Sequence, residues 1–193
     1  PLTCLVDPSW ARIANHDHAH VGGPPVAKFH ADEAKALEKS LEPEQTSRLH
    51  EFFQRALLAA AAPCGLLFSH GVPDENLRDL SQLDAIGLRP TDGSGQAVLA
   101  GLLRAYGQEG EKVELMLAAL DRAHPGLDLR MVVHGHDRDP EGIFIEEGNQ
   151  ICPVIFGAIR AKKRFLSLDL SSRYEHAGDL REGREIRRLY PVG

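Results

Sequence analysis

Two short apolar runs in the sequence are each followed directly by a histidine and a glycine. Residues 64–69 precede His70-Gly71, and residues 129–133 precede His134-Gly135. Apolar runs of this length, bounded by turn residues, are typical of buried strands. Ligands of layered α/β folds collect where strands end, so a histidine at two strand ends is more informative than a histidine on a helix face.

Segments with helical spacing lie around these two runs. We predict helices over residues 31–41, from Pro43 to residue 61, and over 74–83, 96–106 and 111–123. Further strands are predicted over 142–146, 151–156 and 164–168. Helices interleaved with strands, followed by a run of strands, predict an α/β fold with a sheet core. We expect one domain over 1–193, with the charged residues 171–193 as a surface tail.

Composition excludes several classes of protein. The 193 residues are 42% hydrophobic and 26% charged, which argues against a disordered chain. No apolar run approaches the roughly 20 residues of a membrane span, and no secretory signal is visible. The net charge of −6 argues against a surface that binds nucleic acid. We therefore expect a cytoplasmic protein without a membrane or nucleic-acid partner.

Histidine, and not cysteine, is the residue type that favours a metal site. Cys4, Cys64 and Cys152 are widely spaced and form no CxxC pair, so a zinc site made of thiolates is not expected. The chain has 10 histidines. A metal in this protein would therefore be held by nitrogen and oxygen ligands.

Three short constellations combine such ligands. Asn15-His16-Asp17 places an amide oxygen beside a histidine that, held by a carboxylate, can act as a general acid. His70 and the His134-Gly135-His136 tract follow the two buried strands. Each has an alternative interpretation, as a histidine-rich loop or as a structural histidine at a strand end. Together they suit Mn²⁺, Fe²⁺ or Zn²⁺.

The order of these constellations resembles that of the calcineurin-like metallophosphoesterases, and more narrowly the PPP-type serine/threonine phosphoprotein phosphatases. That family carries the metal motifs GDxHG, GDxxDRG, GNH[ED], HGG and a final GH or AH. Ala14-Asn15-His16-Asp17 is similar to the third motif, and residues 52–72 resemble the segment leading into the fourth. Residues 132–158 are the most specific match, since they contain the last histidine followed by a Glu-Gly turn and a strand.

The resemblance implies a layered α/β/β/α sandwich with mixed sheets and a site for two divalent metal ions, Mn, Fe or Zn. Asn15, His70 and His136 would ligate one ion, and His16 would protonate the leaving group. GDxHG and GDxxDRG have no counterpart in the sequence, so only one ion's non-bridging ligands are present. The chain is therefore expected to be a divergent or bacterial-type member that lacks the N-terminal strands.

The activity implied is metal-assisted hydrolysis of a phosphomonoester, on a phosphorylated protein or a small phosphoester. Arg130, Arg138 and Arg160 are candidates to clamp the phosphate, because a guanidinium matches phosphate geometry. A dinucleoside polyphosphate is also compatible with the same metal core.

Two alternatives belong to other classes. A phosphatase-like chain without the bridging aspartate would bind a partner and not hydrolyse. The tract from His16 to Gly23 also resembles the metallo-β-lactamase signature, with one residue missing and the aspartate displaced.

Overall fold

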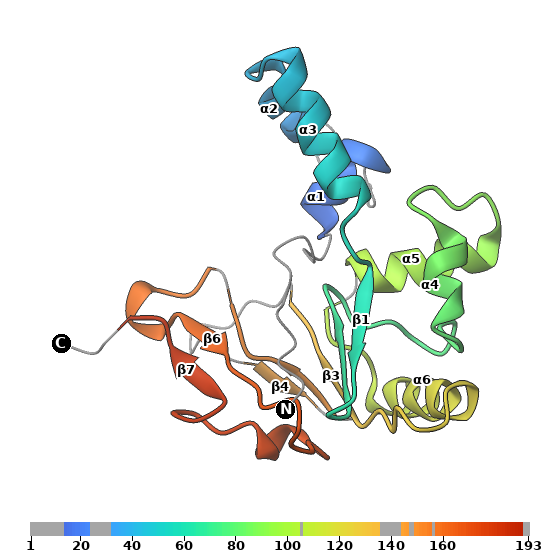
Figure 1. Cartoon of the computed structure of the whole chain (residues 1–193), viewed down its shortest axis with the longest axis vertical. Coiled ribbons are helices and arrows are strands. Elements are labelled where there is room, and N and C mark those ends of the chain that lie inside the picture. The colour runs from blue at the N-terminus through green and yellow to red at the C-terminus, as the bar shows by residue number, and fades with distance from the viewer. Residues whose placement is uncertain are drawn as a thin grey trace.

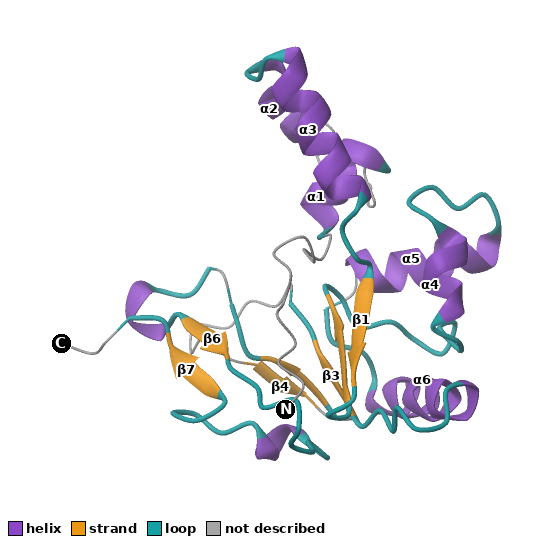
Figure 2. Cartoon of the chain, in the orientation of Figure 1, coloured by secondary structure: helices purple, strands orange, loops and turns teal. Residues whose placement is uncertain are grey.

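The computed structural model describes residues 14–23, 32–104, 106–135, 144–146, 149–155 and 157–190. The fold is mixed α/β (Figures 1 and 2). The helices are α1 (Asn15–Val21), α2 (Asp32–Lys39), α3 (Pro43–Gln54), α4 (Ser81–Ile86), α5 (Gly93–Arg104) and α6 (Gly110–Ala123). The strands are β1 (Ala59–Ala62), β2 (Leu66–Ser69), β3 (Met131–Val133), β4 (Phe144–Glu146), β5 (Gln150–Cys152), β6 (Arg164–Leu166) and β7 (Ile186–Arg188).

The main sheet has the strand order β1-β2-β3-β5-β4. Strands β2, β3 and β5 are parallel to one another, whereas β1 and β4 run antiparallel at the two edges. In the register, Phe68 pairs with Val133, so the residues that follow β2 and β3 leave the sheet side by side. The predicted α/β class and both histidine-ended strands are confirmed. The strands β6 and β7 pair separately as a two-stranded sheet.

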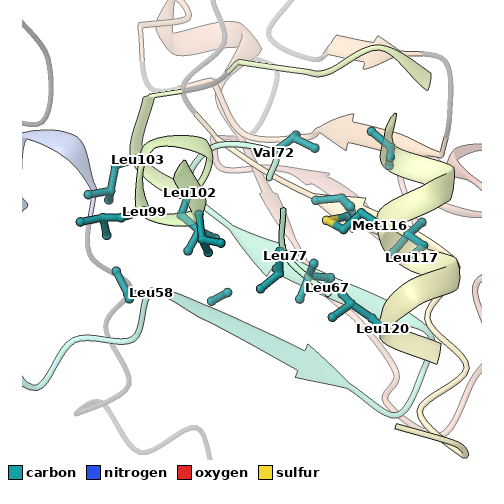
Figure 3. Packing of buried hydrophobic residues seen from close by; sticks show 14 of the residues in the cluster. Leu58, Leu67, Val72, Leu77, Leu99, Leu102, Leu103, Met116, Leu117 and Leu120 are labelled. Carbon is teal, nitrogen blue, oxygen red and sulfur yellow. The ribbon is translucent and has the colours of Figure 1, made fainter. Parts of the chain in front are cut away.

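One face of the main sheet packs against helices. Leu67 of β2 and Val132 of β3 point to this face and are fully buried. They share a cluster with Leu102 of α5 and with Met116 and Leu120 of α6, which Figure 3 draws from close by. Because α5 and α6 were predicted from apolar spacing, their burial on the sheet confirms that pattern.

The opposite face of the sheet is covered by the C-terminal segment. Leu66 and Met131 alternate with the helix-facing residues and contact a cluster that includes Tyr174, Leu180 and Ile186. These last three side chains are almost completely buried. The segment 171–193 was expected to be a surface tail, but its described residues, 171–190, supply side chains to one side of the core. The four-layer sandwich implied by the resemblance stays a prediction.

The alanine-rich segment after α3 differs from the prediction. The helix ends at Gln54, capped by Arg55, and residues 59–62 form β1 instead of continuing the helix. Alanine has a high helix propensity, but here the segment pairs residue by residue with β2. Gly65, at φ +92°, makes the tight turn between the two strands. Tertiary pairing therefore overrides the local preference.

A second predicted helix, over residues 74–83, is also wrong at its start. Asp74 accepts a hydrogen bond from the Asn76 backbone, and Asp79 accepts one from the Ser81 backbone. Such side-chain contacts compete with helical hydrogen bonds and favour turns. Only Ser81–Ile86 is helical.

The helices α1, α2 and α3 form a group that we call the helical lobe. It projects from the sheet in Figure 1, and α1 packs against both α2 and α3. The start of α2 and α3 agrees with the predicted helices, and Asn15 begins the helix α1. No helix in the described ranges is long and apolar enough to cross a membrane.

Candidate functional site

The carboxyl ends of the parallel strands open onto a cavity of about 710 Å³. His70 follows β2, His134 and Gly135 follow β3, and Pro153 follows β5, and all four line this cavity. Leu166, Leu168 and Leu170 of the C-terminal segment form its apolar wall. The location agrees with the rule that ligands of α/β folds bind beyond the carboxyl ends of the strands.

Asn15 and His70 meet at the edge of this cavity. The Oδ1 atom of Asn15 lies 3.1 Å from Nε2 of His70, although the two residues are 55 positions apart in the sequence. Asn15 is buried at the first turn of α1, next to Ala14 in the cavity wall. The structure thus brings together two of the predicted ligands, an amide oxygen and an imidazole nitrogen.

The end of β3 is tied to the end of β2. The Gly135 backbone N–H donates to the His70 carbonyl oxygen at 2.9 Å, which continues the pairing of the two strands. His134 is buried beside it, with Nδ1 2.9 Å from the Gly135 carbonyl oxygen. His136, the third predicted ligand, lies outside the described residues. The structure describes the chain as far as Gly135, which precedes His136 and lines the cavity.

His16, the predicted general acid, lies on the exposed surface of α1. Its Nδ1 atom is 3.3 Å from the Glu33 carboxylate of α2. Asp17, the carboxylate adjacent in sequence, instead accepts a hydrogen bond from the Ala14 backbone at 3.0 Å and caps the helix. The carboxylate that holds His16 thus comes from a different helix from the one the sequence suggested.

Of the arginines proposed as phosphate clamps, the two that the structure describes do not line the cavity. Arg130 lies at the opposite end of β3, where it pairs with Asp128 and Glu175. Arg160 stacks over the Tyr190 ring at 4.5 Å from its centroid. Arg138 lies outside the described part of the chain.

The histidines of the tract from His16 to Gly23 have separate partners. His16 contacts Glu33, His18 contacts the carbonyl oxygens of Gly23 and Leu88, and His20 contacts Glu38. Because each ring contacts a different partner, the three histidines of this tract do not converge on one point. This arrangement does not support the metallo-β-lactamase alternative.

One cluster in the helical lobe was not found from the sequence. His20 of α1, Glu38 of α2 and His50 of α3 place their ligand atoms within 4.8 Å of one another. The Glu38 carboxylate receives hydrogen bonds from His50 and His20, which lower its pKa. The three residues lie on separate helices and form no short motif, so the high histidine count was the only signal for them.

Comparisons with known proteins find a distant likeness in structure. No protein-family model matches the chain, and no curated protein matches it. Among solved structures, the chain is similar to a protein serine/threonine phosphatase from Saccharomyces cerevisiae with similarity to human phosphatase PP5. The identity is 17% and the TM-score is 0.48, over 74% of this chain and 46% of the other. The chain thus spans less than half of that phosphatase, and the function proposed below rests on the geometry of the site.

Proposed function

We propose that this chain is part of a metal-dependent phosphomonoester hydrolase of the serine/threonine phosphatase type. Asn15, His70 and His136 would hold one of two divalent ions, Mn, Fe or Zn. The substrate would be a phosphorylated protein or a small phosphoester. A dinucleoside polyphosphate is the remaining alternative within the same chemistry.

The contact between Asn15 and His70 is the observation that carries this proposal. The two side chains come from different elements, and their potential ligand atoms lie 3.1 Å apart. The resemblance implies that these two side chains share one metal site, and their contact across 55 positions of the sequence agrees with that expectation. The adjoining end of β3 supports a third contribution from the residue after Gly135.

The donor atoms fit a divalent ion. An amide oxygen and a neutral imidazole are ligands for borderline metals, and here they meet at His70, which lines the cavity. When bound, such an ion supplies Lewis-acid polarisation of the phosphoryl oxygens. The protein's own contribution is to hold the ligands: the first turn of α1 positions Asn15, and the pairing of β2 with β3 positions His70.

His16 would give a proton to the departing alkoxide oxygen of the substrate. A carboxylate on one imidazole nitrogen orients the ring and leaves the other nitrogen to donate. Glu33 lies 3.3 Å from Nδ1 of His16 and would be the carboxylate that positions this ring.

A second candidate function is a phosphatase-like protein that binds a partner and does not hydrolyse. It is favoured by one observation, the lack of a GDxHG or GDxxDRG motif in the sequence, since those motifs carry the other metal's ligands and the bridging aspartate. This candidate predicts metal binding at Asn15 and His70 without turnover.

The test is p-nitrophenyl phosphate hydrolysis with added Mn²⁺, using the chain together with any residues that precede Pro1 in the natural protein. We expect His70→Ala and His136→Ala to lower turnover by at least about 100-fold, because each removes a metal ligand. Asn15→Ala should do the same. His16→Ala should lower turnover by about 100-fold or more while the metal content stays the same.

His124→Ala is the matched control. His124 is half-buried like His70 and contacts a carboxylate, that of Asp79, as His16 contacts Glu33. It lies outside the cavity. Full activity in His70→Ala would overturn the proposed hydrolase. Normal metal binding with no hydrolysis of any phosphoester would favour the non-catalytic candidate.

A further inference from the structure

The three residues of the His20–Glu38–His50 cluster bridge all three helices of the helical lobe. The Nδ1 atom of His20 lies 2.7 Å from Oε1 of Glu38, and the Nε2 atom of His50 lies 2.8 Å from the same oxygen. The His20 ring also stacks on Phe53 of α3, with ring centroids 5.4 Å apart. Two imidazole nitrogens and one carboxylate oxygen therefore converge on one point, with one ring held by packing.

The helical lobe has little apolar packing to hold these helices together. No residue of α3 is fully buried, and Leu37 of α2 and Phe52 of α3 are each 46% exposed. A unit of about 40 residues without a sufficient core is the kind that natural proteins stabilise with a metal or a disulfide.

We propose that His20, Glu38 and His50 bind a zinc ion that links α1, α2 and α3. Two histidines and one glutamate are an established ligand set for Zn²⁺, which binds imidazole nitrogen and carboxylate oxygen in a tetrahedral arrangement. This site is separate from the one proposed at Asn15 and His70, and it does not depend on hydrolysis.

The cluster needs only a small rearrangement to accept the ion. Ligand atoms around a tetrahedral zinc are about 3.3 Å apart, so each nitrogen must move away from the Glu38 oxygen by roughly half an ångström. Each neutral ring would carry its proton on the nitrogen that faces away from the metal. A water molecule can supply the fourth ligand, because the side chains of Glu38 and His50 are 26% and 34% exposed.

Zinc at this position would also order α1. His20 lies in the last turn of this helix and Asn15 in its first turn. An ion that fixes His20 to α2 and α3 therefore restrains the helix that presents Asn15 to His70.

The experiment measures zinc affinity by competition with a chromophoric zinc chelator. The His70→Ala chain is used as the starting protein, so that the cavity site does not contribute. We expect this chain to bind one Zn²⁺, and the added change His50→Ala to weaken binding by at least about 100-fold, more than the loss of an outer-shell contact costs. His124→Ala in the same chain is the matched control and should leave the affinity unchanged.

A second variant and a second measurement guard against misfolding. Glu38→Gln keeps the size of the side chain but removes its charge, and it should weaken zinc binding by at least about 10-fold. In the His70→Ala chain, zinc should slow amide hydrogen exchange in α1, α2 and α3 and leave β3 and α6 unchanged. The proposal is overturned if that chain binds no zinc, or if its affinity is the same with and without His50 and Glu38. It is also overturned if zinc leaves exchange in the helical lobe unchanged.

Discussion

The sheet body, made of β1–β5 with α5 and α6, contains Leu66, Leu67, Leu102 and Met116 at zero exposure. In the helical lobe, by contrast, α3 buries no residue and α2 buries only Ala34 among its described side chains. The sheet body is held by dense apolar packing. The helical lobe is held by the His20–Glu38–His50 cluster and by a few contacts to the sheet body.

This difference separates the two parts of the proposed active site. His70 and His134 lie at the ends of strands in the rigid sheet body, whereas Asn15 and His16 lie on a helix of the loosely packed lobe. The cavity site is complete only when the lobe is docked. Regions with few buried apolar contacts open at lower free energy, so the lobe is the part of the site that we expect to move.

The largest expected effect contrasts one leucine from each region. Leu67→Ala should lower the free energy of unfolding by about 2–5 kcal/mol, because it leaves a cavity between β2 and the helices. The Leu37 side chain of α2 is 46% exposed, so Leu37→Ala should change the free energy of unfolding by less than about 0.5 kcal/mol. Urea denaturation measures both. Equal losses would show that the two regions do not differ in packing.

A smaller effect is expected where the lobe docks on the sheet body. His18 is buried in α1, with Nδ1 2.9 Å from the Gly23 carbonyl oxygen and Nε2 2.8 Å from that of Leu88. Arg89 reinforces the junction by donating to the Val21 carbonyl oxygen at 2.9 Å. His18→Ala should cost about 1–3 kcal/mol, because it leaves a buried carbonyl without its donor.

Hydrogen exchange locates that loss. We expect faster exchange in α1 and in residues 87–89 of the His18→Ala chain, with α6 and β3 unchanged. His176→Ala is the control, since the His176 side chain is 65% exposed and its ring contacts the Asp179 carboxylate on the surface. This change should have no measurable effect. Uniformly faster exchange in His18→Ala would mean that the lobe and the sheet body unfold as one unit.

The sequence predicts the sheet body better than the lobe for a physical reason. Contiguous apolar residues form β2 and β3, and helical spacing of leucines forms α5 and α6, so the local pattern and the final burial agree. In β1 the local pattern and the final structure disagree, because four alanines favour a helix locally and form a strand only through pairing with β2. Pairing of that kind is not visible in a single segment.

The candidate site follows the same division. The positions of His70 and His134 follow from the strands that precede them, which the sequence predicts. The contact of Asn15 with His70 was expected from the order of the motifs and not from any local pattern. The partner of His16 depends on how α2 packs on α1, and the convergence of His20, Glu38 and His50 depends on three helices at once. Contacts between separate helices therefore could not be predicted from local sequence patterns.

The smallest expected effect concerns the sheet body at alkaline pH. Cys64 is a free thiol with zero exposure at the start of the turn between β1 and β2, and burial raises its pKa above the ordinary value of 9.0. In the unfolded chain the thiol ionises near pH 9, whereas in the folded chain it stays protonated to higher pH. Its contribution to stability is therefore full below pH 9 and is lost as the pH rises through the folded pKa.

The loss should be at most about 1.4 kcal/mol per pH unit, the limit for a single proton. Urea denaturation from about pH 8 to about pH 10 measures it, and the slope should be smaller in Cys64→Ala, in which tyrosines and lysines titrate unchanged. Hydrogen exchange should assign the alkaline loss to the β1–β2 hairpin and not to the helical lobe. An identical slope in the two proteins, or labelling of Cys64 by iodoacetamide at neutral pH without unfolding, would contradict a thiol sealed in the apolar core. That result would remove the main distinction drawn between the two regions, because the sheet body would then open as readily as the lobe.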